Sequence, residues 1–554
     1  MKTSPITVAL LCAATFAVPA ALSAQDNPQN GDSRRFEFQP DTLVLSRSVY
    51  EGKASTITIG ETLPLGCQGG STGLTVNVPL AAGGTTPVAV PCGVASDNGE
   101  YPNLFDAHNV WNNSNSDGSF GVTSPIFLDN ITTDGGLLGT LRIPTDQIVT
   151  SFSSKSELAL NRSIDGRSIT FMGYRGGIGC GGSAVSPTRP NLLDVSASNT
   201  PGVCDPTNPV ITTFVSDPVV PAAYYRAVAE VDGDGHVSFT DGNAYSGDNG
   251  RAAIKGGNDL YYMVGNDNSG DLSKKQVSTT LDGIALSNAT GAELLFPGQT
   301  PPLPPSIDMI GRLLFAGDKP GKDTNFRGIT IFNNTLYVSK GSGGNGINTV
   351  YQVGSAGTLP TGSAADLAAE PITILPGFPN TAASTSTAFP FGIWFADANT
   401  LYVCDEGDGT LVTPAVNGNV ADAQSLATAG LQKWRLISGT WVRQYILQDG
   451  LNIGVPYSIR EYPASINPAT GGCRNIAGRH NDDGTVTIYA ITSTISANGD
   501  TGADPNKLVK VTDRVSDTTL PAGGYLGHFE TVRSAQAREV FRGVAFAPGD
   551  HGGE

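Results

Sequence analysis

The sequence is poor in charged residues and in histidine, and it has no long apolar run after its first two dozen residues. Charged residues make up 15% of the 554-residue chain, well below the roughly 25% typical of globular proteins. The five histidines form no His-Glu-x-x-His or His-x-x-x-His array, and no Cys-x-x-Cys pair occurs. The common zinc motifs therefore have no local support, and no segment beyond the N-terminus has the length of a transmembrane helix.

The few charges that are present are mostly acidic. The chain has 33 basic and 50 acidic residues, and its formal net charge is −17. A surface with this charge repels phosphate backbones and anionic membranes. We therefore expect no nucleic-acid partner and no lipid surface as the main partner.

Glycine and proline are abundant, with 69 and 36 residues. They are scattered without a period among many Val, Ile, Thr and Tyr residues, which is typical of short strands joined by many turns. The composition predicts an all-β protein and gives no support to a helix-rich domain.

The N-terminus has the pattern of a secretory signal peptide. Lys2 supplies the basic end, an apolar stretch runs from Val8 to Val18, and Leu22-Ser23-Ala24 is a small-residue cleavage site. We expect residues 1–24 to be removed near Ala24 and the protein to be secreted, to the extracellular space or the periplasm. Residues 25–40 are polar and predict a loose N-terminal segment, followed by a single domain over 41–550.

Six cysteines remain after the leader, an even set that favours disulfides in an exported protein. Proximity in the sequence favours three pairs: Cys67 with Cys92, Cys180 with Cys204, and Cys404 with Cys473. The last pair would connect one repeat to the next. A zinc site is the alternative, and it lacks the usual ligand spacing.

A short phrase recurs along the chain: a small residue, a β-branched residue, and then a strand that carries an aromatic residue. Arg327-Gly328-Ile329 precedes Thr335-Leu336-Tyr337-Val338, and Phe391-Gly392-Ile393 precedes Thr400-Leu401-Tyr402-Val403. Further examples are Phe120-Gly121-Val122, Arg162-Ser163-Ile164, Arg251-Ala252-Ala253-Ile254, Asp282-Gly283-Ile284, Arg474-Asn475-Ile476 and Arg542-Gly543-Val544. A recurring phrase of this kind indicates one supersecondary unit repeated many times.

Each unit reads as a four-stranded antiparallel sheet, which buries its faces by stacking on neighbours around an axis. The sequence therefore predicts a β-propeller with long inter-strand loops. We count seven blades, with six and eight as alternatives. The lone C-terminal phrase at Arg542 is expected to pair with a strand near Leu43-Val44-Leu45 or Thr56-Ile57-Thr58 and so close the ring. A β-sandwich is the second architecture.

The runs from Asn325 to Gly343, from Phe391 to Phe395 and from Leu401 to Gly409 resemble exported propeller-type proteins of bacteria, among them proteins with no assigned activity. The likeness extends over most of the chain beyond about residue 100. This resemblance implies a propeller fold and export, and it implies no activity.

Arginine stands directly before the small residue in several phrases. These candidate ligand-binding residues are Arg162, Arg251, Arg327, Arg474 and Arg542. If the phrase opens the innermost strand of each blade, the guanidiniums converge on one end of the channel and suit carboxylate or phosphate groups. The alternative, which we favour, is that each arginine pairs with a carboxylate of an adjacent blade.

Turns rich in Asp, Asn and Gly are the second group of candidates. Asp405-Glu406-Gly407-Asp408-Gly409 could fold oxygen ligands around calcium, with Asp405 and Asp408 as ligands. The same residues are what tight hairpins require, and we favour turns. No cofactor is required by the sequence, and calcium is the one metal that it suggests.

Two histidines next to such turns, His236 and His480, are the candidates for a general base. A surface role is the more common one for a histidine in this position. The sequence therefore leaves two functions open. The first, which we favour, is an exported propeller that binds an extracellular polysaccharide or protein through loops on one face, as a monomer. The second is an extracellular lyase or hydrolase that acts on an anionic polymer or ester at the channel mouth.

Overall fold

The computed structural model describes residues 36–50, 123–175, 226–242, 250–265, 325–341, 347–381, 388–408, 428–495 and 502–549, apart from positions 146, 153, 463, 465 and 466. It also places the backbone of short strands at β2 (Thr62–Leu63), β3 (Leu74–Pro79), β4 (Thr85–Val90), β5 (Gly93–Ser96), β6 (Asn112–Asn113), β17 (Ala292–Leu295), β18 (Ile307–Ile310), β19 (Arg312–Leu313), β26 (Leu411–Ala415) and β27 (Gly418–Ala421). Everything below concerns these residues of the compact unit that begins at Phe36.

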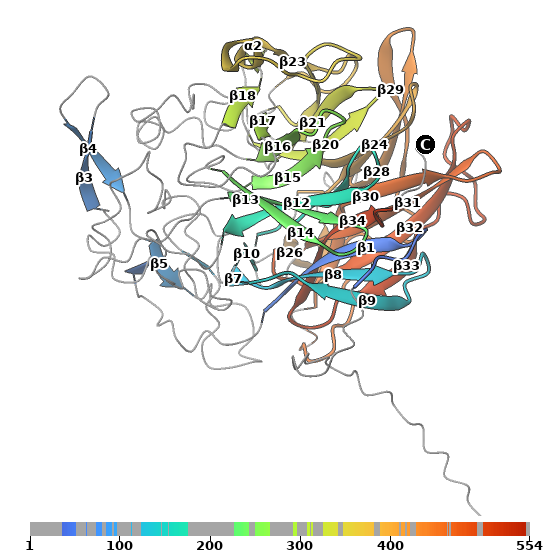
Figure 1. The fold of residues 1–554 in the computed structure, drawn as a ribbon. Helices are drawn as coiled ribbons and strands as arrows, with labels where there is room; N and C mark the ends of the chain where they lie inside the picture. The colour runs from blue at the N-terminus through green and yellow to red at the C-terminus, as the bar shows by residue number, and fades with distance from the viewer. Residues whose placement is uncertain are drawn as a thin grey trace, which may run out of the picture. The chain divides into compact units, whose positions relative to one another are not determined.

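The unit is built from antiparallel sheets (Figure 1). Four sheets have four strands. Their orders are β34 (Glu539–Phe546), β1 (Leu43–Val49), β8 (Ile126–Ile131), β9 (Leu137–Arg142); β15 (Gly250–Lys255), β16 (Tyr261–Gly265), β17 (Ala292–Leu295), β18 (Ile307–Ile310); β24 (Pro390–Asp397), β25 (Thr400–Asp405), β28 (Gly430–Ile437), β29 (Thr440–Leu447); and β30 (Ala469–His480), β31 (Thr485–Ile495), β32 (Lys507–Arg514), β33 (Glu530–Ser534).

Two larger sheets complete the set. One has the order β20 (Phe326–Phe332), β21 (Thr335–Lys340), β22 (Thr349–Val353), β23 (Pro371–Ile374), β19 (Arg312–Leu313), and its last pair is parallel. The other is more irregular and has the order β14 (Val237–Gly242), β13 (Arg226–Asp232), β12 (Ser168–Arg175), β10 (Ile148–Ser151), β7 (Thr123–Ser124), with β11 (Asn161–Arg162) also paired to β12. The described residues contain one short helix, α2 (Ala364–Ala369), and no helix long and apolar enough to cross a bilayer.

The first strands of the sheets lie against one another in chain order. Strand β15 lies against β20, β20 against β24, β24 against β30, β30 against β34, and β34 against β11, while β12 and β11 lie against β15. Hydrophobic side chains fill the spaces between successive sheets, for example Tyr262 of β16 with Phe326 of β20 and Leu336 of β21. A ring of sheets of this kind is a propeller-like fold.

The strands expected from the repeated phrase are confirmed. Leu336–Val338 lies in β21 and Leu401–Val403 lies in β25, each directly after the strand that holds its phrase. Valine, isoleucine and tyrosine favour the pleated, half-buried surface of a strand. The β20–β21 hairpin turns at Asn333 and Asn334, whose φ values are 47° and 55°, as a two-residue hairpin turn with positive φ requires.

The expected count of seven blades is wrong for the described residues, which contain fewer sheets of four or more strands. Two of the phrases that we counted, at 120–122 and 282–284, lie outside the described residues. A third, Arg162-Ser163-Ile164, belongs to the irregular sheet around β12 and starts where β11 ends. Equal phrases therefore do not mark equal blades in this chain.

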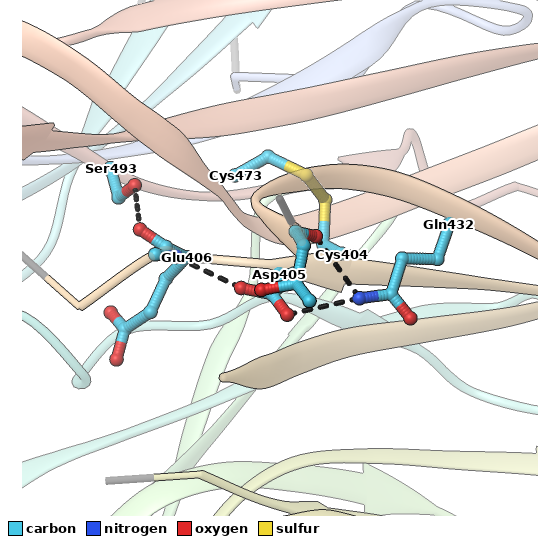
Figure 2. Close-up of a disulfide and its surroundings, with 8 residues drawn as sticks. Cys404, Asp405, Glu406, Gln432, Cys473 and Ser493 are labelled. Atoms are coloured by element: carbon cyan, nitrogen blue, oxygen red, sulfur yellow. Dashed lines mark hydrogen bonds between the residues drawn. A yellow bond between two sulfur atoms is a disulfide. The ribbon is translucent and has the colours of Figure 1, made fainter. Parts of the chain in front are cut away.

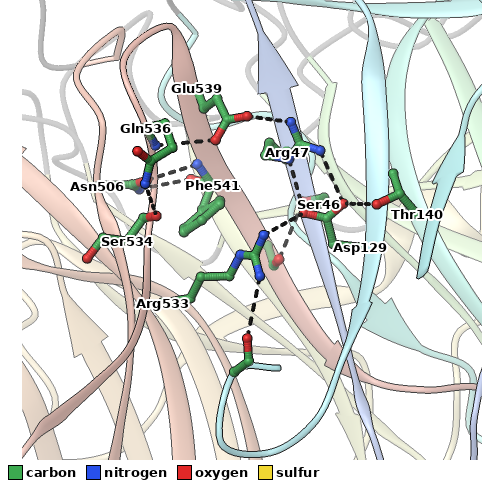
Figure 3. A network of polar contacts seen from close by, with 12 residues as sticks. Ser46, Arg47, Asp129, Thr140, Asn506, Arg533, Ser534, Gln536, Glu539 and Phe541 are labelled. Carbon is green, nitrogen blue, oxygen red and sulfur yellow. Dashed lines mark hydrogen bonds and ion pairs between the residues drawn. The ribbon is translucent and has the colours of Figure 1, made fainter. Parts of the chain in front are cut away.

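The two ends of the domain meet as expected. Strand β1 pairs with β34 on one side and β8 on the other, with Leu45 opposite Val544 (Figure 1). Arg47 of β1 ties the three strands together: its Nε lies 3.0 Å from Asp129 Oδ2 and its Nη1 lies 2.7 Å from Glu539 Oε1 (Figure 3). The alternative partner at Thr56-Ile57-Thr58 lies outside the described residues.

Candidate functional site

The small residue of the repeated phrase lies where neighbouring inner strands meet. The small residue lets neighbouring inner strands approach closely: a Cβ on Gly328 would overlap the carbonyl oxygen of Phe391, and one on Gly392 would overlap that of Arg474. At the next step round the ring Asn475 replaces glycine, and its side chain accepts a hydrogen bond from the backbone N–H of Val544 at 2.6 Å. The inner strands are thus held together at the level of the phrase.

A pocket of about 600 Å³ lies on one side of this level. Every blade contributes to its wall through residues in the phrase or directly after it, such as Ile254, Thr330, Ile393, Ile476 and Val544. We call it the central pocket. Because all the inner strands converge on it, its shape is set by the packing of the whole ring.

The central pocket combines aromatic and polar side chains. Trp394 lies against the backbone of Gly478, where a Cβ would overlap the indole ring. The Arg479 guanidinium lies 5.7 Å from the centre of the Phe546 ring, and both residues line the pocket. Asn161, Arg162, Asp165, Asn333, Asn334 and Asp41 supply the polar part of the wall. Flat apolar surfaces beside amides and charged groups suit a polar organic ligand.

The five candidate arginines do not form one funnel. Arg162 lines the central pocket, and its Nε donates to Gly166 O at 3.1 Å. The other four are buried and do not line this pocket, and two of them donate to backbone carbonyls. Arg251 donates to Phe326 O at 2.7 Å, and Arg542 donates to Gly502 O at 2.8 Å and to Phe152 O. Ligand binding by the five together stays a prediction.

Arg474 has a carboxylate partner at salt-bridge distance. Its Nε lies 2.9 Å from Oε2 of Glu406, which comes from the adjacent blade. The other oxygen of Glu406 lies 3.5 Å from Nζ of Lys155. Arg327 acts electrostatically on the same carboxylate. We call Lys155, Arg327, Glu406 and Arg474 the cationic cluster, because three basic groups surround one acidic group.

The Cys404–Cys473 disulfide positions this cluster, and its presence confirms the third expected pair. It joins β25 to β30 with a Cα–Cα distance of 5.3 Å, and the residues that follow its two ends are Asp405-Glu406 and Arg474. Figure 2 shows the carboxylate of Glu406 pointing away from the disulfide while Asp405 faces Gln432. The other four cysteines, Cys67, Cys92, Cys180 and Cys204, lie outside the described residues.

Lys155 lies in a loop, 152–160, that the ring holds from several sides. Arg327 donates to Ser156 Oγ, and Asn475 Nδ2 donates to Leu160 O at 3.3 Å. Glu157 fixes the base of the loop, since it accepts hydrogen bonds from Thr150 Oγ1 at 2.7 Å and Tyr174 OH at 2.5 Å. The loop is therefore anchored on three blades.

Burial and charge shift the pKa values of this region. Glu406 acts to raise the pKa of Lys155, but burial and the two arginines outweigh it and lower that pKa to about 8. Burial alone would raise the pKa of Glu406, yet Lys155, Arg474 and Arg327 lower it to about 2. Burial raises the pKa of Asp405 to about 7, although the hydrogen bonds that it accepts from the backbone N–H groups of Phe389 and Gly407 act to lower it. Two groups thus titrate near neutral pH.

The predicted metal ligands and general bases are not brought together. Asp405 accepts hydrogen bonds from Phe389 N at 2.9 Å, Gly407 N at 3.0 Å and Gln432 Nε2 at 2.9 Å, while Asp408 is half-buried. No group of three or more His, Cys, Asp and Glu side chains suited to a metal occurs in the described parts of the chain. His236 is exposed beside Asp232, and His480 contacts Ala396 O at 2.6 Å. Calcium binding and base catalysis by these residues stay predictions.

Sequence reasoning missed Lys155, Glu406, Trp394 and Arg479. Lys155 lies in a segment without any repeat, so no pattern marks it. Trp394 and Arg479 do follow the phrases at Phe391 and Arg474, three and five residues on. The position after the phrase was thus a usable signal for the central pocket.

No protein-family model and no curated protein matches the sequence. Among solved structures, a glucose dehydrogenase is 13% identical, with 70% of this chain and 92% of that chain covered and a TM-score of 0.31. The hemagglutinin-neuraminidase ectodomain of parainfluenza virus 5 is 10% identical over 74% of this chain and 75% of that one, with a TM-score of 0.29. An apocarotenoid oxygenase variant of Synechocystis is 8% identical over 91% and 98%, with a TM-score of 0.32. These similarities are too low to support an inference about function.

Proposed function

We propose that this protein is an exported propeller that binds an extracellular polysaccharide, with a few sugar units of the polysaccharide bound in the central pocket. The observation that carries the proposal is the composition of that pocket. Trp394 offers a flat apolar face, and Arg162, Arg479 and several Asn and Asp side chains surround it. Sugar rings have one apolar face and a rim of hydroxyl groups, which aromatic and polar side chains of this kind bind together.

We further propose that the protein is exported and acts as a monomer. A disulfide persists in oxidising compartments, so Cys404–Cys473 supports export after cleavage near Ala24. The acidic net charge of −17 disfavours strongly anionic polymers by long-range repulsion, while the arginines of the pocket attract single acidic groups on a sugar. A monomer is sufficient, because one chain builds the whole pocket.

Binding of purified protein to neutral and acidic polysaccharides, measured by calorimetry, tests the proposal. Trp394→Ala and Arg479→Met should each weaken binding roughly tenfold or more, as central contacts commonly do. Gly478→Ala should also weaken it, because its Cβ would displace the indole ring of Trp394. Arg443→Met is the control, since Arg443 is exposed and lies outside the pocket wall. Unchanged affinity of Trp394→Ala and Arg479→Met for every polysaccharide that the native protein binds would refute the proposal.

A second candidate is a lyase or hydrolase acting on an anionic polymer or ester. The observation that favours it is that Lys155 and Asp405 have pKa values near 8 and 7, where general acids and bases work best. Incubation of the protein with acidic polysaccharides and model esters, with and without a chelator, separates the two candidates. Turnover that Lys155→Met abolishes would establish the enzyme, whereas binding without turnover would count against it.

A further inference from the structure

In the cationic cluster, Lys155 and Arg474 both lie against one carboxylate, that of Glu406. Lys155, Arg327 and Arg474 share Glu406 as their common carboxylate. Asp405 is the next acidic group, and its oxygens accept three hydrogen bonds from Phe389, Gly407 and Gln432. Among the described residues, Lys155 and Arg474 have no other carboxylate at salt-bridge distance. A buried excess of positive charge is costly unless a counter-ion can join it.

The cluster also keeps donors available for such a counter-ion. The side chain of Lys155 makes one ion pair in the described part of the chain, the 3.5 Å approach to Glu406, and 31% of its surface remains exposed. Arg474 donates through Nε to Glu406, and its two terminal nitrogens have no hydrogen-bond partner among the described residues. Both residues are held on rigid elements, the anchored loop 152–160 and the inner strand β30.

This region is separate from the central pocket. The pocket wall includes Leu160 and Ile476 but no earlier residue of either segment, and it includes none of Lys155, Arg327, Glu406 and Arg474. Between the two, the inner strands approach one another at the level of the phrase. A ligand of the cluster therefore does not compete for the residues proposed to hold a sugar.

We propose that Lys155 and Arg474 form a binding site for a small oxyanion, the phosphate or carboxylate group of a ligand, beside Glu406. An ammonium and the outer edge of a guanidinium are the donors that bind such groups most strongly in proteins. Glu406 orients both donors and does not neutralise them. The site goes beyond the polysaccharide proposal and does not depend on it.

Inorganic phosphate is the probe. Its binding to the full chain is measured by calorimetry at constant ionic strength, with sodium chloride as the replaced salt. Phosphate should bind the native protein, and Lys155→Met should weaken it at least tenfold. Lys510→Met is the matched control, because Lys510 is 33% exposed and pairs with Glu530 at 3.3 Å, close to the exposure and pair distance of Lys155. That control should change affinity less than twofold. Acetate as a competitor distinguishes the source: displacement of phosphate supports a carboxylate ligand, and its absence supports a phosphate ligand.

A second measurement does not depend on any variant. Phosphate should protect Lys155 of the native protein from reductive methylation, read by peptide mass spectrometry, and should leave the labelling of Lys510 unchanged. The proposal is overturned if phosphate does not bind, if Lys155→Met binds it as well as the native protein, or if phosphate protects both lysines equally. Loss of polysaccharide binding in Trp394→Ala with phosphate binding intact would show that the two sites are separate.

Discussion

Two lysines of this protein, the buried Lys433 and the half-buried Lys155, face opposite conditions. Lys433 of β28 lies 2.9 Å from Asp513 of β32, and both side chains are 0% exposed. Lys433 also donates to Tyr445 OH and to Arg514 O, while Asp513 accepts from Tyr402 OH and Tyr445 OH. Lys155 has one contact at 3.5 Å and shares its carboxylate with two arginines.

The difference shows how to separate a structural ion pair from a binding site. At Lys433 one cation meets one anion and every named donor has an acceptor, so the pair holds two blades together. At Lys155 two basic groups, Lys155 and Arg474, share one carboxylate, and the lysine stays partly exposed. A buried ion pair with balanced charge stabilises the fold. Unbalanced charge at a rigid site lowers the stability of the fold and is typical of a functional site. The substitutions below test this rule.

The largest effect should come from Lys433→Met. The substitution leaves Asp513 buried without a counter-charge, which typically costs about 3–5 kcal/mol of the free energy of unfolding. Chemical denaturation at pH 7 measures it. Lys510→Met, which breaks an exposed pair with Glu530, should cost less than about 1 kcal/mol. Equal effects of the two substitutions would contradict the structural role of Lys433.

Removal of the disulfide should rank next. Cys404→Ala with Cys473→Ala opens a loop with a sequence separation of 69, and loop-closure entropy predicts a loss of about 4 kcal/mol, with smaller values common in practice. Because the bond lies beside Glu406 and Arg474, the double variant should also weaken phosphate binding. A variant with native stability, measured by denaturation, would show that the bond does not constrain the two blades.

The ion-pair network around Arg47, which joins the strands near the two ends of the domain, is a second network with balanced charge. Arg47→Met leaves the buried Asp129 without its closest cation, because Arg533 lies 3.9 Å away. The loss should be about 2–3 kcal/mol, less than at Lys433 because Arg47 is partly exposed. Thermal unfolding measures it, with the exposed Arg142→Met as control. A fall no larger than that of Arg142→Met would mean that backbone pairing alone closes the ring.

Apart from the controls, the smallest effect, and the one of opposite sign, should come from Lys155→Met. The lowered pKa of Lys155, about 8, means that burial of its charge destabilises the native state at pH 7. Its removal should stabilise the protein by about 1–2 kcal/mol, after allowance for its partial exposure. The native protein binds fewer protons than the unfolded chain between pH 8 and 10.5, so its own stability rises over that interval. The advantage of Lys155→Met should therefore disappear by pH 10.5, as denaturation curves at several pH values would show.

The sequence predicted the repeating strands and the meeting of β1 with β34, because these follow from local patterns of apolar and small residues. It predicted the Cys404–Cys473 bond from the even number and the spacing of the cysteines. It failed on the blade count, because Arg162-Ser163-Ile164 has the sequence of the phrase without its place in the ring. In that sheet the segment from Leu158 to Leu160, and not the phrase, lies against Gly543 of the neighbouring inner strand. It also treated five arginines as equivalent. Their partners come from loops such as 152–160, whose path depends on tertiary contacts that no repeat encodes.

The titration of the Lys155 amine tests the central claim most directly. Its reactivity toward an acylating reagent, followed by peptide mass spectrometry from pH 6 to 11 with and without saturating phosphate, gives its pKa in both states. The account predicts a pKa of about 8 for the free protein and a clear increase with phosphate, because a bound anion favours the charged amine. A pKa at the ordinary value of lysine, about 10.4, that phosphate does not change would contradict it.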